Sequence, residues 1–422
     1  MFAILERSDA EYDASLTALA RRGDADLSRV EGAVREILDA VKERGDDAVK
    51  EMTQRFEGRD LARVVVPEES WRADAAKAPP EVRAMLTEAA ERVRRYHEHQ
   101  RDDGFSYEED GIRLGQRVRA VKAAGIYAPG GKARYPSSVL MSAVPAAVAG
   151  VPRIVLATPR PTPEVLAAAE IAGVTEVIDA GGAQGIGALA YGTETLTRVD
   201  KIVGPGNIYV ACAKRLVFGL VDIEGIAGPS EILVIADDAA DPVRVAADLL
   251  SQAEHDEDAY ALLITLSRGQ ADRVRDEVAR QIETLPRKGV ASASIRDHAV
   301  GFVVGDLTEA ARVADELAVE HVSLQVADAD ALLESIGAVG AAFLGTHTPE
   351  AAGDYAAGPS HVLPTGGAAR FTSPLGVYDF LVRTSLIRYS AEAIEAQADL
   401  LEGLARLEGL EAHARAVAVR RS

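Results

Sequence analysis

Several short stretches of the chain place polar side chains, of types suited to metal binding and proton transfer, among apolar neighbours. They are LLSQAEHD with Gln252 and His255, AVEHVSL with Glu320 and His321, GDYAAGPSH with Asp354, and EGLEAHARAV with His413. The amide oxygen, imidazoles and carboxylate of the first, third and fourth stretches suit a divalent metal. The adjacent glutamate and histidine offer two bases of different strength. Together these residues predict a metal-assisted oxidation.

Gln252 and His255 are expected near the end of one helix. Asp241 and Pro242 form an N-cap and first-turn pair, which predicts a helix from Pro242 to about Glu254. Residues three positions apart project together, so this pair can share a metal. Taken alone, a histidine near a helix end is more often a surface residue favoured by the helix dipole.

Glu320 and His321 are predicted to end another helix, which begins near Asp306 and Thr308 with Glu309 as a capping partner. Adjacent helical residues point about 100° apart, so both reach one ligand most easily where the helix ends. The carboxylate could activate water while the imidazole, which titrates near neutrality, moves a substrate proton. The alternative is an ordinary histidine at the end of a helix.

Asp354 lies in a long stretch of small residues, HTPEAAGDYAAGPSHVLPTGGAARF, with few apolar anchors. Such loops are usually functional or disordered, and its glycines, Pro359 and His361 favour a shaped, functional loop. Cys212, the single cysteine, lies in the helical run NIYVACAKRLV, so we expect a small buried residue and not a thiolate nucleophile. If an aldehyde is oxidised here, water must therefore supply the second oxygen.

The elements that must position these residues follow from the apolar periodicity. Helical spacing runs from Leu27 to Val41, with Gly45 as the stop, and from Pro80 to about Tyr96. Short β-rich runs then alternate with helical stretches, which is typical of βαβ units and parallel sheets. The β-rich runs are RIVLAT, VTEVIDAG, VDKIV, SEILVIAD, YALLITLS and VGFVVGD.

This alternation predicts two α/β units, with a seam near Gly225–Pro229 and no repeat at a fixed period. The tail from Ser390 is helical, is interrupted by Gly403 and Gly409, and is expected to form an appended arm. Glycine-rich stretches follow the strands, at the carboxyl ends where open α/β sheets bind ligands. The dinucleotide fingerprint G-x-G-x-x-G and the Walker motif are both absent from the sequence, so spacing alone identifies no cofactor.

The composition narrows the class of protein. The 422 residues allow two or more domains, and the net charge of −20 argues against nonspecific binding to nucleic acid or an anionic membrane. A single cysteine excludes an intramolecular disulfide and a cysteine-based zinc cluster. No secretory signal or run of 18 apolar residues is apparent. We therefore expect a soluble, cytoplasmic protein.

With these stretches in view, the chain closely resembles the histidinol dehydrogenase family. The matching motifs occur in one order over most of the chain: GIYAPGGKARYPSSVLM, GGAQGIGALAYGTE, VDKIVGPGN, AGPSEILVIAD, DLLSQAEHD, EHVSL, AGDYAAGPSHVLPT and GLEAHARAV. The resemblance implies NAD-dependent oxidation of L-histidinol to L-histidinal and then to L-histidine, with two NAD+ consumed. It implies zinc ligands at Gln252, His255, Asp354 and His413.

The resemblance also assigns the remaining site residues. Substrate contacts are implied at the metal ligands, at Glu320 and His321, and at Ser230, His361 and Glu408; NAD contacts are implied at Tyr127, Gln184 and Asn207. In the family's mechanism, His321 takes the hydroxyl proton in the first oxidation. Glu320 then activates water for attack on the aldehyde, and His321 assists again. The metal acts chiefly as a template that orients substrate.

The fold class implied is α/β, with two incomplete Rossmann-like domains, a helical N-terminal segment and a C-terminal helical arm. The expected boundaries are 1–22 for the N-terminal segment, 23–126 with 230–376 for the larger domain with the metal and catalytic residues, 127–229 for the domain with the NAD contacts, and 377–422 for the arm. The family forms homodimers, and the arm is expected to cross to the partner subunit with Glu408 and His413.

Two other interpretations stay open at this point. One keeps the fold and changes the substrate to another amino alcohol or small diol. The other is a zinc hydrolase in which Glu320 activates water for attack on an amide or ester. The residues implied to contact NAD argue against the hydrolase. The choice between zinc and manganese is also open, because these nitrogen and oxygen ligands accept both metals.

Overall fold

A computed structural model describes residues 2–23, 27–130 and 135–421. Residues 131–134, which belong to the glycine-rich stretch APGGKARYPSS, lie outside the described residues. The chain divides into two compact units: the first is Met1–Gln100 with Lys122–Phe380, and the second is Arg101–Val121 with Leu381–Ser422. Within the described residues, no helix is long and apolar enough to cross a membrane. The mixed α/β class predicted from the sequence is confirmed.

The first sheet of the first unit is parallel throughout. Its strands, in spatial order, are β1 (Ala3–Glu6), β12 (Val300–Val303), β11 (Tyr260–Thr265), β10 (Glu231–Ala236), β13 (His321–Gln325) and β14 (Ala341–Leu344). The central strands β10 and β13 are buried along their whole length, as expected for near-continuous apolar runs covered on both faces.

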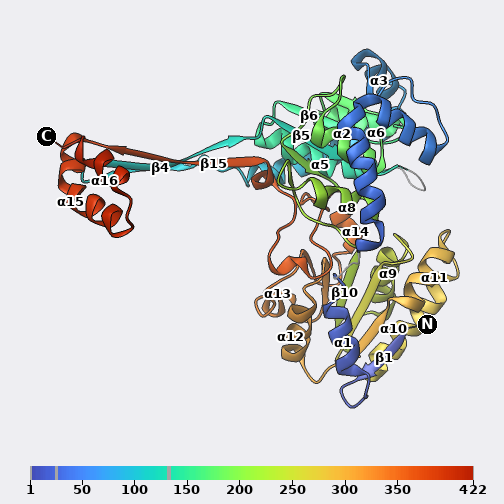
Figure 1. Ribbon diagram of the computed structural model, residues 1–422. Coiled ribbons are helices and arrows are strands. Elements are labelled where there is room, and N and C mark those ends of the chain that lie inside the picture. Colours follow the sequence, from blue (N-terminus) through green and yellow to red (C-terminus); the bar gives the residue numbers. More distant parts are fainter. Residues whose placement is uncertain (1, 24–26, 131–134, 422) are drawn as a thin grey trace. The chain divides into compact units, whose positions relative to one another are not determined.

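Helices cover both faces of this sheet (Figure 1). On one face lie α1 (Tyr12–Ala20), α12 (Leu307–Leu317) and α13 (Ala329–Leu333); on the other lie α9 (Pro242–Ala253), α10 (Arg268–Ile282) and α11 (Lys288–Asp297). The predicted N-cap of α9 is present, because the Asp241 carboxylate accepts from Val243 N and Pro242 occupies the first turn. Gln252 therefore points into the buried side of the last helical turn.

The expected helical position of Glu320 and His321 is wrong. Helix α12 begins as predicted, with Asp306 accepting from Glu309 N, but it ends at Leu317 because Ala318 adopts a left-handed conformation (φ 43°). The next residues belong to the run VEHVSLQV, which is β-rich and buried, and His321 opens strand β13. The two bases therefore lie at the amino end of a central parallel strand.

The second sheet of the same unit is built in the same way. Its order is β2 (Val65–Val66), β7 (Glu176–Ile178), β6 (Arg153–Ala157), β5 (Ala123–Tyr127), β8 (Lys201–Val203) and β9 (Asp222–Ile223). Only the β2–β7 pair of this sheet is antiparallel among the described residues. In chain order, β5 to β9 occupy the same relative positions as β10 to β14 do in the first sheet. The sequence shows no repeat at a fixed period, so this shared strand order became apparent only in the structure.

Helices α2 (Ser28–Glu57), α7 (Gly182–Tyr191) and α8 (Ile208–Val217) share a core with the second sheet. The predicted stop is confirmed: the helix is interrupted at Gly45, whose backbone is not helical (φ 50°, ψ −127°), and a second helical stretch continues from there to Glu57. A neighbouring helical group comprises α3 (Glu68–Ala75), α4 (Pro80–Glu98), α5 (Pro136–Ala149) and α6 (Pro163–Ala172). As a division of the chain into domains, the boundaries expected from the sequence stay a prediction.

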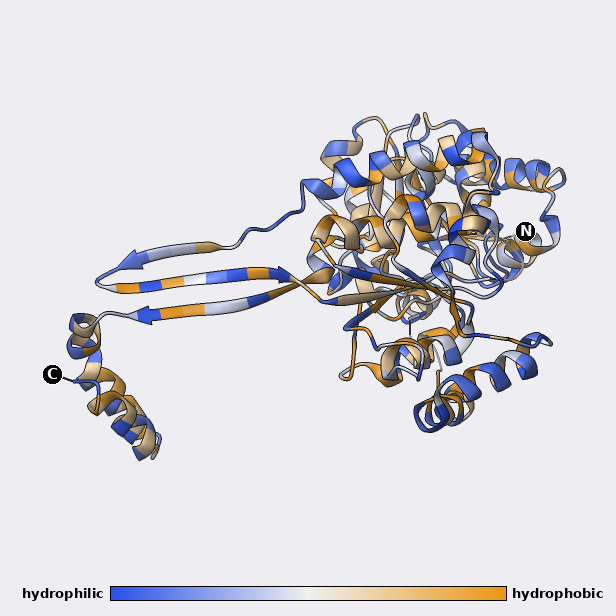
Figure 2. Ribbon diagram, turned by 90° about the horizontal axis from the view of Figure 1, so that it is seen from above, coloured by the Kyte–Doolittle hydropathy of each residue, from blue (hydrophilic) through white to orange (hydrophobic). Residues whose placement is uncertain are grey.

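The second unit contains an antiparallel sheet and two helices. The sheet has the order β15 (Leu381–Tyr389), β4 (Ile112–Ala120) and β3 (Phe105–Glu109), and the helices are α15 (Ala391–Leu407) and α16 (Glu411–Ala418). Apolar residues are visible on the helices next to the C-terminus in Figure 2. Leu400, Leu404 and Leu407 are 61%, 52% and 83% exposed, so much of this apolar surface is uncovered within one chain.

Candidate active site

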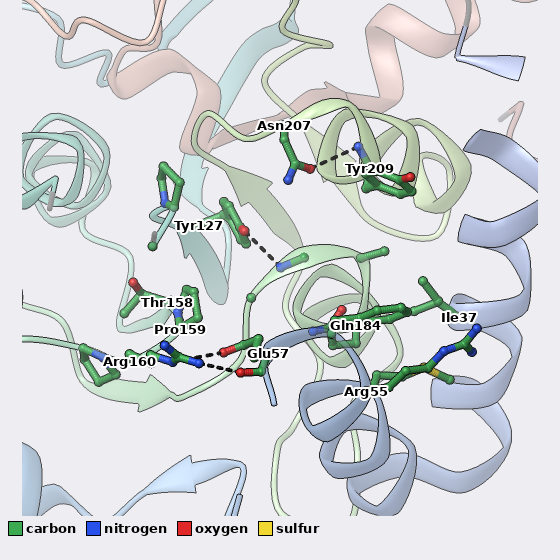
Figure 3. Close-up of a pocket in the computed structure, with 18 of the residues that line it drawn as sticks. Ile37, Arg55, Glu57, Tyr127, Thr158, Pro159, Arg160, Gln184, Asn207 and Tyr209 are labelled. Atoms are coloured by element: carbon green, nitrogen blue, oxygen red, sulfur yellow. Dashed lines mark hydrogen bonds and ion pairs between the residues drawn. The ribbon is translucent and has the colours of Figure 1, made fainter. Parts of the chain in front are cut away.

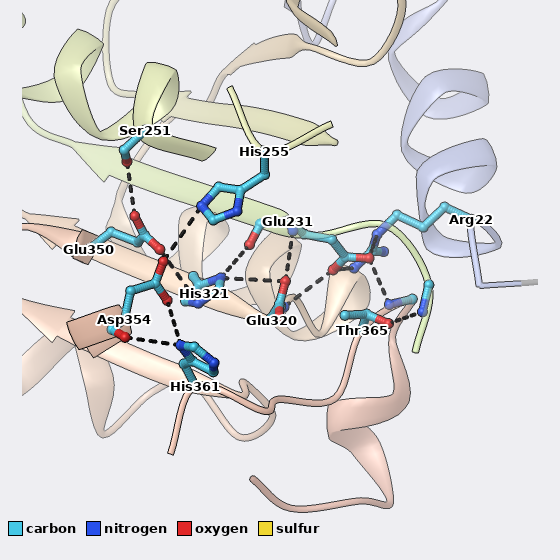
Figure 4. A network of polar contacts seen from close by, with 12 residues as sticks. Arg22, Glu231, Ser251, His255, Glu320, His321, Glu350, Asp354, His361 and Thr365 are labelled. Carbon is cyan, nitrogen blue, oxygen red and sulfur yellow. Dashed lines mark hydrogen bonds and ion pairs between the residues drawn. The ribbon is translucent and has the colours of Figure 1, made fainter. Parts of the chain in front are cut away.

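A network of polar side chains lies at the amino ends of β10 and β13 (Figure 4). The main-chain N–H of Glu231 donates to Glu320 Oε2 over 2.9 Å, and Glu320 N donates back to Glu231 Oε2 over 3.2 Å. The Glu231 carbonyl lies 2.9 Å from His321 Nδ1. An imidazole whose Nδ1–H is donated to a carbonyl leaves Nε2 as the basic nitrogen. The geometry thus prepares His321 to accept a proton through Nε2.

Burial shifts the pKa values of these two residues in opposite directions. Burial lowers the pKa of His321 to about 4, so the ring is neutral at neutral pH. Burial, with the negative charge of Glu231, raises the pKa of Glu320 well above its usual range. A carboxylate of raised pKa is a stronger base once ionised. Burial thus favours the neutral form of both side chains: His321 can accept a proton, and Glu320 can act as a base once it is ionised.

Three of the predicted metal ligands belong to the first unit, and two of them, His255 and Asp354, approach each other. Gln252 on α9 is 1% exposed, and its Oε1 is buried with no hydrogen-bond partner among the described residues. His255 Nε2 lies 3.5 Å from Asp354 Oδ2. The hydrogen bond with Asp354 raises the pKa of His255; burial opposes ionisation of Asp354, but that bond and the neighbouring histidines lower its pKa on balance. A buried amide oxygen without a partner, an imidazole and a carboxylate are donor types that suit a divalent cation.

Asp354 lies on a short helix, α14 (Glu350–Tyr355), and not in the loop expected from the small residues around it. Pro349 precedes its first turn, which allows a helix to form despite that composition. His361 lies beyond the helix, with Nδ1 3.0 Å from the Asp354 carbonyl and Nε2 3.2 Å from Ser138 Oγ. Burial lowers the pKa of His361, so a neutral ring is expected here too.

Glu350 is part of this cluster and was not identified from the sequence. It is 1% exposed, its Oε1 lies 3.7 Å from His321 Nε2, and its Oε2 accepts from Ser251 Oγ over 2.9 Å. Burial and the charge of Asp354 raise the pKa of Glu350 to about 7. Possible ligand atoms of His321, Glu350 and Asp354 lie within 4.8 Å of one another. The signal in the sequence was the Glu350–Asp354 spacing, which places both carboxylates on one face of a helix.

The other residues expected to contact substrate or metal fall into two groups. Ser230 immediately precedes Glu231, next to the network. Glu408 and His413 belong to the second unit, at the C-cap of α15 and within α16, and both are exposed there. They are therefore not part of the cluster within the first unit.

Tyr127, Gln184 and Asn207 line a pocket of about 920 Å³ at the second sheet (Figure 3). Tyr127 ends β5, Gln184 lies in the first turn of α7, and Asn207 caps α8 through Oδ1, which accepts from Tyr209 N and Val210 N. The Tyr127 hydroxyl accepts from Gly182 N over 3.0 Å, and burial raises the pKa of Tyr127 to about 12. The three residues implied to contact NAD thus share one cavity, of a size typical for ligand sites.

The wall of this pocket combines helix starts with apolar and charged side chains. The first residues of α7 and Asn207 at the start of α8 line it, and helix N-termini favour anionic groups. Ile37, Met52 and Phe56 of α2 form an apolar side, and Arg160 donates to the Glu57 carbonyl at one end. Such a wall suits a ligand with anionic and flat apolar parts.

A glycine shapes the chain beside this pocket. Gly204, in the VGPGN stretch after β8, has φ 119°, and a Cβ there would lie 2.0 Å from the Tyr127 carbonyl oxygen. Only glycine allows this backbone conformation and this close approach. The glycines of this stretch therefore serve local geometry, although their spacing differs from the dinucleotide fingerprint.

Comparisons with known proteins agree with one another over the whole chain. Residues 20–421 match the family model described as histidinol dehydrogenase. The chain is 50% identical to the histidinol dehydrogenase of Aquifex aeolicus over 420 residues, covering 99% of both chains, and 51% identical to that of Rhodospirillum rubrum over 424 residues, covering 99% and 98%. The crystal structure of histidinol dehydrogenase from Elizabethkingia anophelis is similar with a TM-score of 0.93 and 33% identity, covering 99% and 98%.

Proposed function

The chain belongs to the histidinol dehydrogenase family, and from this premise we propose that it oxidises L-histidinol through L-histidinal to L-histidine with NAD+ and a bound zinc ion. It is an oxidoreductase of histidine biosynthesis. The observation that best supports the chemical assignment is the placement of Glu320 and His321. One buried residue, Glu231, contacts both, and His321 Nε2 lies 3.7 Å from Glu350 Oε1, in a cluster that also includes Asp354.

Zinc is proposed at Gln252, His255 and Asp354, with His413 as a further ligand. The buried, unsatisfied Oε1 of Gln252 and the short approach of His255 to Asp354 support this fit. The set contains no sulfur ligand, and zinc and manganese are both compatible with it. When bound, the cation would orient the substrate and stabilise negative charge on its oxygen.

NAD is proposed in the pocket lined by Tyr127, Gln184 and Asn207. Its volume and the helix starts in its wall support a dinucleotide with a pyrophosphate group. When bound, NAD+ would accept a hydride in each oxidation. The side chains of Gln184 and Asn207 would orient the cofactor through hydrogen bonds, and Tyr127 supports the turn at Gly182.

His321 and Glu320 divide the proton transfers between them. In the first oxidation, His321 Nε2 takes the hydroxyl proton as the carbon loses hydride, which yields the aldehyde. In the second, Glu320 takes a proton from water as the water oxygen attacks the aldehyde carbon. His321 gives the proton of the first oxidation to the carbonyl oxygen as the hydrate forms. It then takes a hydroxyl proton of the hydrate as the carbon loses its second hydride, which yields the acid. Burial keeps the His321 imidazole neutral, so its Nε2 is free to accept a proton, and it raises the pKa of Glu320, so that the carboxylate is a stronger base once ionised.

The second unit is proposed to complete the site of another copy in a homodimer. Its exposed leucines recur at helical spacing on α15, and a second chain would cover them. His413 and Glu408 would then reach the partner's site. Mixing a His255→Ala chain with a His413→Ala chain should restore one intact site per heterodimer. No recovery of zinc binding or activity in the mixture would refute the exchange.

The decisive test of the function is the yield of NADH per substrate molecule. The zinc-loaded protein with excess NAD+ and limiting L-histidinol should produce two equivalents of NADH. One equivalent would indicate an alcohol dehydrogenase that stops at the aldehyde. No NADH with histidinol, but NADH with another amino alcohol or a diol, would change the substrate.

The single cysteine, Cys212, is a buried free thiol, which supports the proposed cytoplasmic setting.

A further inference from the structure

A buried ion pair lies directly behind the two proposed bases. Arg22, just after α1, donates through Nε to Glu231 Oε1 over 2.8 Å and through Nη2 to Glu231 Oε2 over 2.6 Å. The two side chains are 2% and 1% exposed. Gly366 N also donates to Glu231 Oε1 over 2.7 Å. A planar, bidentate pair with further donors fixes the Glu231 carboxylate in position.

Glu231 contacts both bases with its main chain as well as with its side chain. Its N–H holds Glu320 Oε2, its carboxylate accepts from Glu320 N, and its carbonyl accepts from His321 Nδ1. Glu231 opens β10 just as His321 opens the adjacent strand β13. The orientation of both bases therefore depends on where the start of β10 is anchored.

We propose that Glu231 and Arg22 are positioning residues for the reaction: the pair anchors the start of β10 so that Glu231 orients Glu320 and selects the tautomer of His321. Neither residue is among those that the family resemblance assigned to the site. The inference rests on the proposed function, because it takes Glu320 and His321 as the proton acceptors. It also gives the N-terminal segment, through Arg22, a part in catalysis.

The charge of Glu231 matters in addition to its position. Arg22 directs both its Nε and its Nη2 to Glu231, with Nη2 also donating to the Leu317 carbonyl. A buried guanidinium without a carboxylate is costly. If Glu231 lost its charge, Arg22 would compete for the carboxylate of Glu320, which lies against Glu231. Glu320 would then be a weaker base for water.

The test compares four substitutions in the zinc-loaded, full-length protein: Glu231→Gln, Glu231→Asp, Arg22→Lys and the double variant Arg22→Gln/Glu231→Gln. The kcat and KM for histidinol and for histidinal are measured separately, together with zinc content and thermal midpoint. Glu231→Gln should lower kcat for histidinal at least about tenfold, with KM changed by less than about twofold and zinc retained. The double variant should turn over histidinal faster than Glu231→Gln, because the competing guanidinium is gone.

A matched control exists at the amino ends of the second sheet. Arg153 at the start of β6 makes a bidentate pair with Glu176 at the start of β7, over 2.8 and 2.9 Å. No proposed site residue contacts that pair among the described residues. Glu176→Gln should therefore lower the thermal midpoint and leave kcat unchanged. Glu231→Asp, which keeps the charge, should retain more activity than Glu231→Gln.

Two results would overturn the proposal. One is a folded Glu231→Gln protein with the kcat of the wild type. The other is a set of variants in which kcat falls only in proportion to the folded fraction and Glu231→Asp has no higher kcat than Glu231→Gln. If Glu231→Gln does not fold, Arg22→Lys decides: a lowered kcat at unchanged KM supports positioning, and an unchanged kcat refutes it. A wild-type protein that makes no NADH from histidinol would refute the proposed function instead.

Discussion

The two parallel sheets of the first unit share a strand order but present their candidate sites at opposite edges. In the second sheet, the pocket lies where β5, β6, β7 and β8 end, at the switch point between β5 and β8. In the first sheet, the polar network lies where β10 and β13 begin. Topology predicts ligand binding at carboxyl ends. That expectation agrees with the pocket in the second sheet and does not describe the network in the first.

The carboxyl edge of the first sheet differs from that of the second in its side chains. There, the buried carboxylate of Asp248 accepts from Ser323 Oγ over 3.1 Å and from Gln325 Nε2 over 2.8 Å. These bonds link α9 to β13, and Asp248 and Gln325 line a smaller pocket there, of about 380 Å³. At the amino edge, by contrast, acidic and imidazole groups gather. The two sheets have equivalent topologies, and the side chains at each edge determine where a site forms.

The two sites also differ in their electrostatics. The network of the first sheet contains buried carboxyl groups whose pKa values are raised, at Glu320 and Glu350. The pocket of the second sheet is lined by helix starts, an apolar side of α2 and the phenol of Tyr127. The first arrangement suits proton transfer and cation binding, and the second suits holding an anionic cofactor. Substitutions at the two sites should accordingly change different kinetic constants.

The largest effect is expected for His321→Asn. This change removes the basic Nε2 and should lower kcat for both oxidations by about 10²–10⁴-fold, the usual contribution of a general base. Zinc content and the KM for NAD+ should remain near those of the wild type. Steady-state turnover with each substrate, with metal analysis of the same preparation, checks this. A normal rate of the alcohol step would contradict the assignment of His321.

Glu320→Gln should separate the two oxidations. Oxidation of the aldehyde should fall by about 10²-fold or more, because it needs an activated water, whereas oxidation of the alcohol should be affected less. A general base acts only when ionised, and burial raises the pKa of Glu320. Aldehyde oxidation by the wild type should therefore decline on acidification at a higher pH than an ordinary glutamate would give. Equal losses in both steps, or an unchanged pH profile in the variant, would count against this role.

Gln252→Ala should weaken zinc binding by at least about tenfold, because it removes the buried, unpaired Oε1 that is proposed as a ligand. Added zinc should raise the thermal midpoint of the wild type by mass action and raise that of the variant only at higher zinc concentration. Thermal melts at several zinc concentrations give both affinities. The pocket of the second sheet should still bind NAD+ in this variant. Unchanged zinc affinity would remove Gln252 from the metal set.

The smallest effect is expected at the other sheet, from Tyr127→Phe. The change leaves Gly182 N without its acceptor, at a cost of about 1–3 kcal/mol. We expect a rise of roughly tenfold in the KM for NAD+, with zinc content and the KM for histidinol unchanged. Kinetics at varied NAD+ measure this directly. A change confined to the KM for histidinol would contradict the separate roles proposed for the two sheets.

Much of the fold was predictable because apolar periodicity is a local property. The strand runs RIVLAT, SEILVIAD and YALLITLS and the helices beginning at Pro80 and Pro242 occur where the pattern placed them. The dipeptide Glu320–His321 was assigned to a helix end because the left-handed turn at Ala318 has no glycine or asparagine to mark it. Glu350 escaped notice because a carboxylate at the start of a helix is ordinary until its burial is known.

The amino-acid sequence by itself determined three things: the polar residues in apolar stretches, the alternation of strands and helices, and a series of motifs long enough to identify a family. Only the tertiary structure decided which residues contact one another. Arg22 and Glu231 are 209 positions apart, and their contact depends on how α1 packs beside the first sheet. The preference of a segment for helix or strand depends on residues that are neighbours in the sequence. Burial, shifted pKa values and shared ligands arise only when segments distant in the sequence pack together and exclude water.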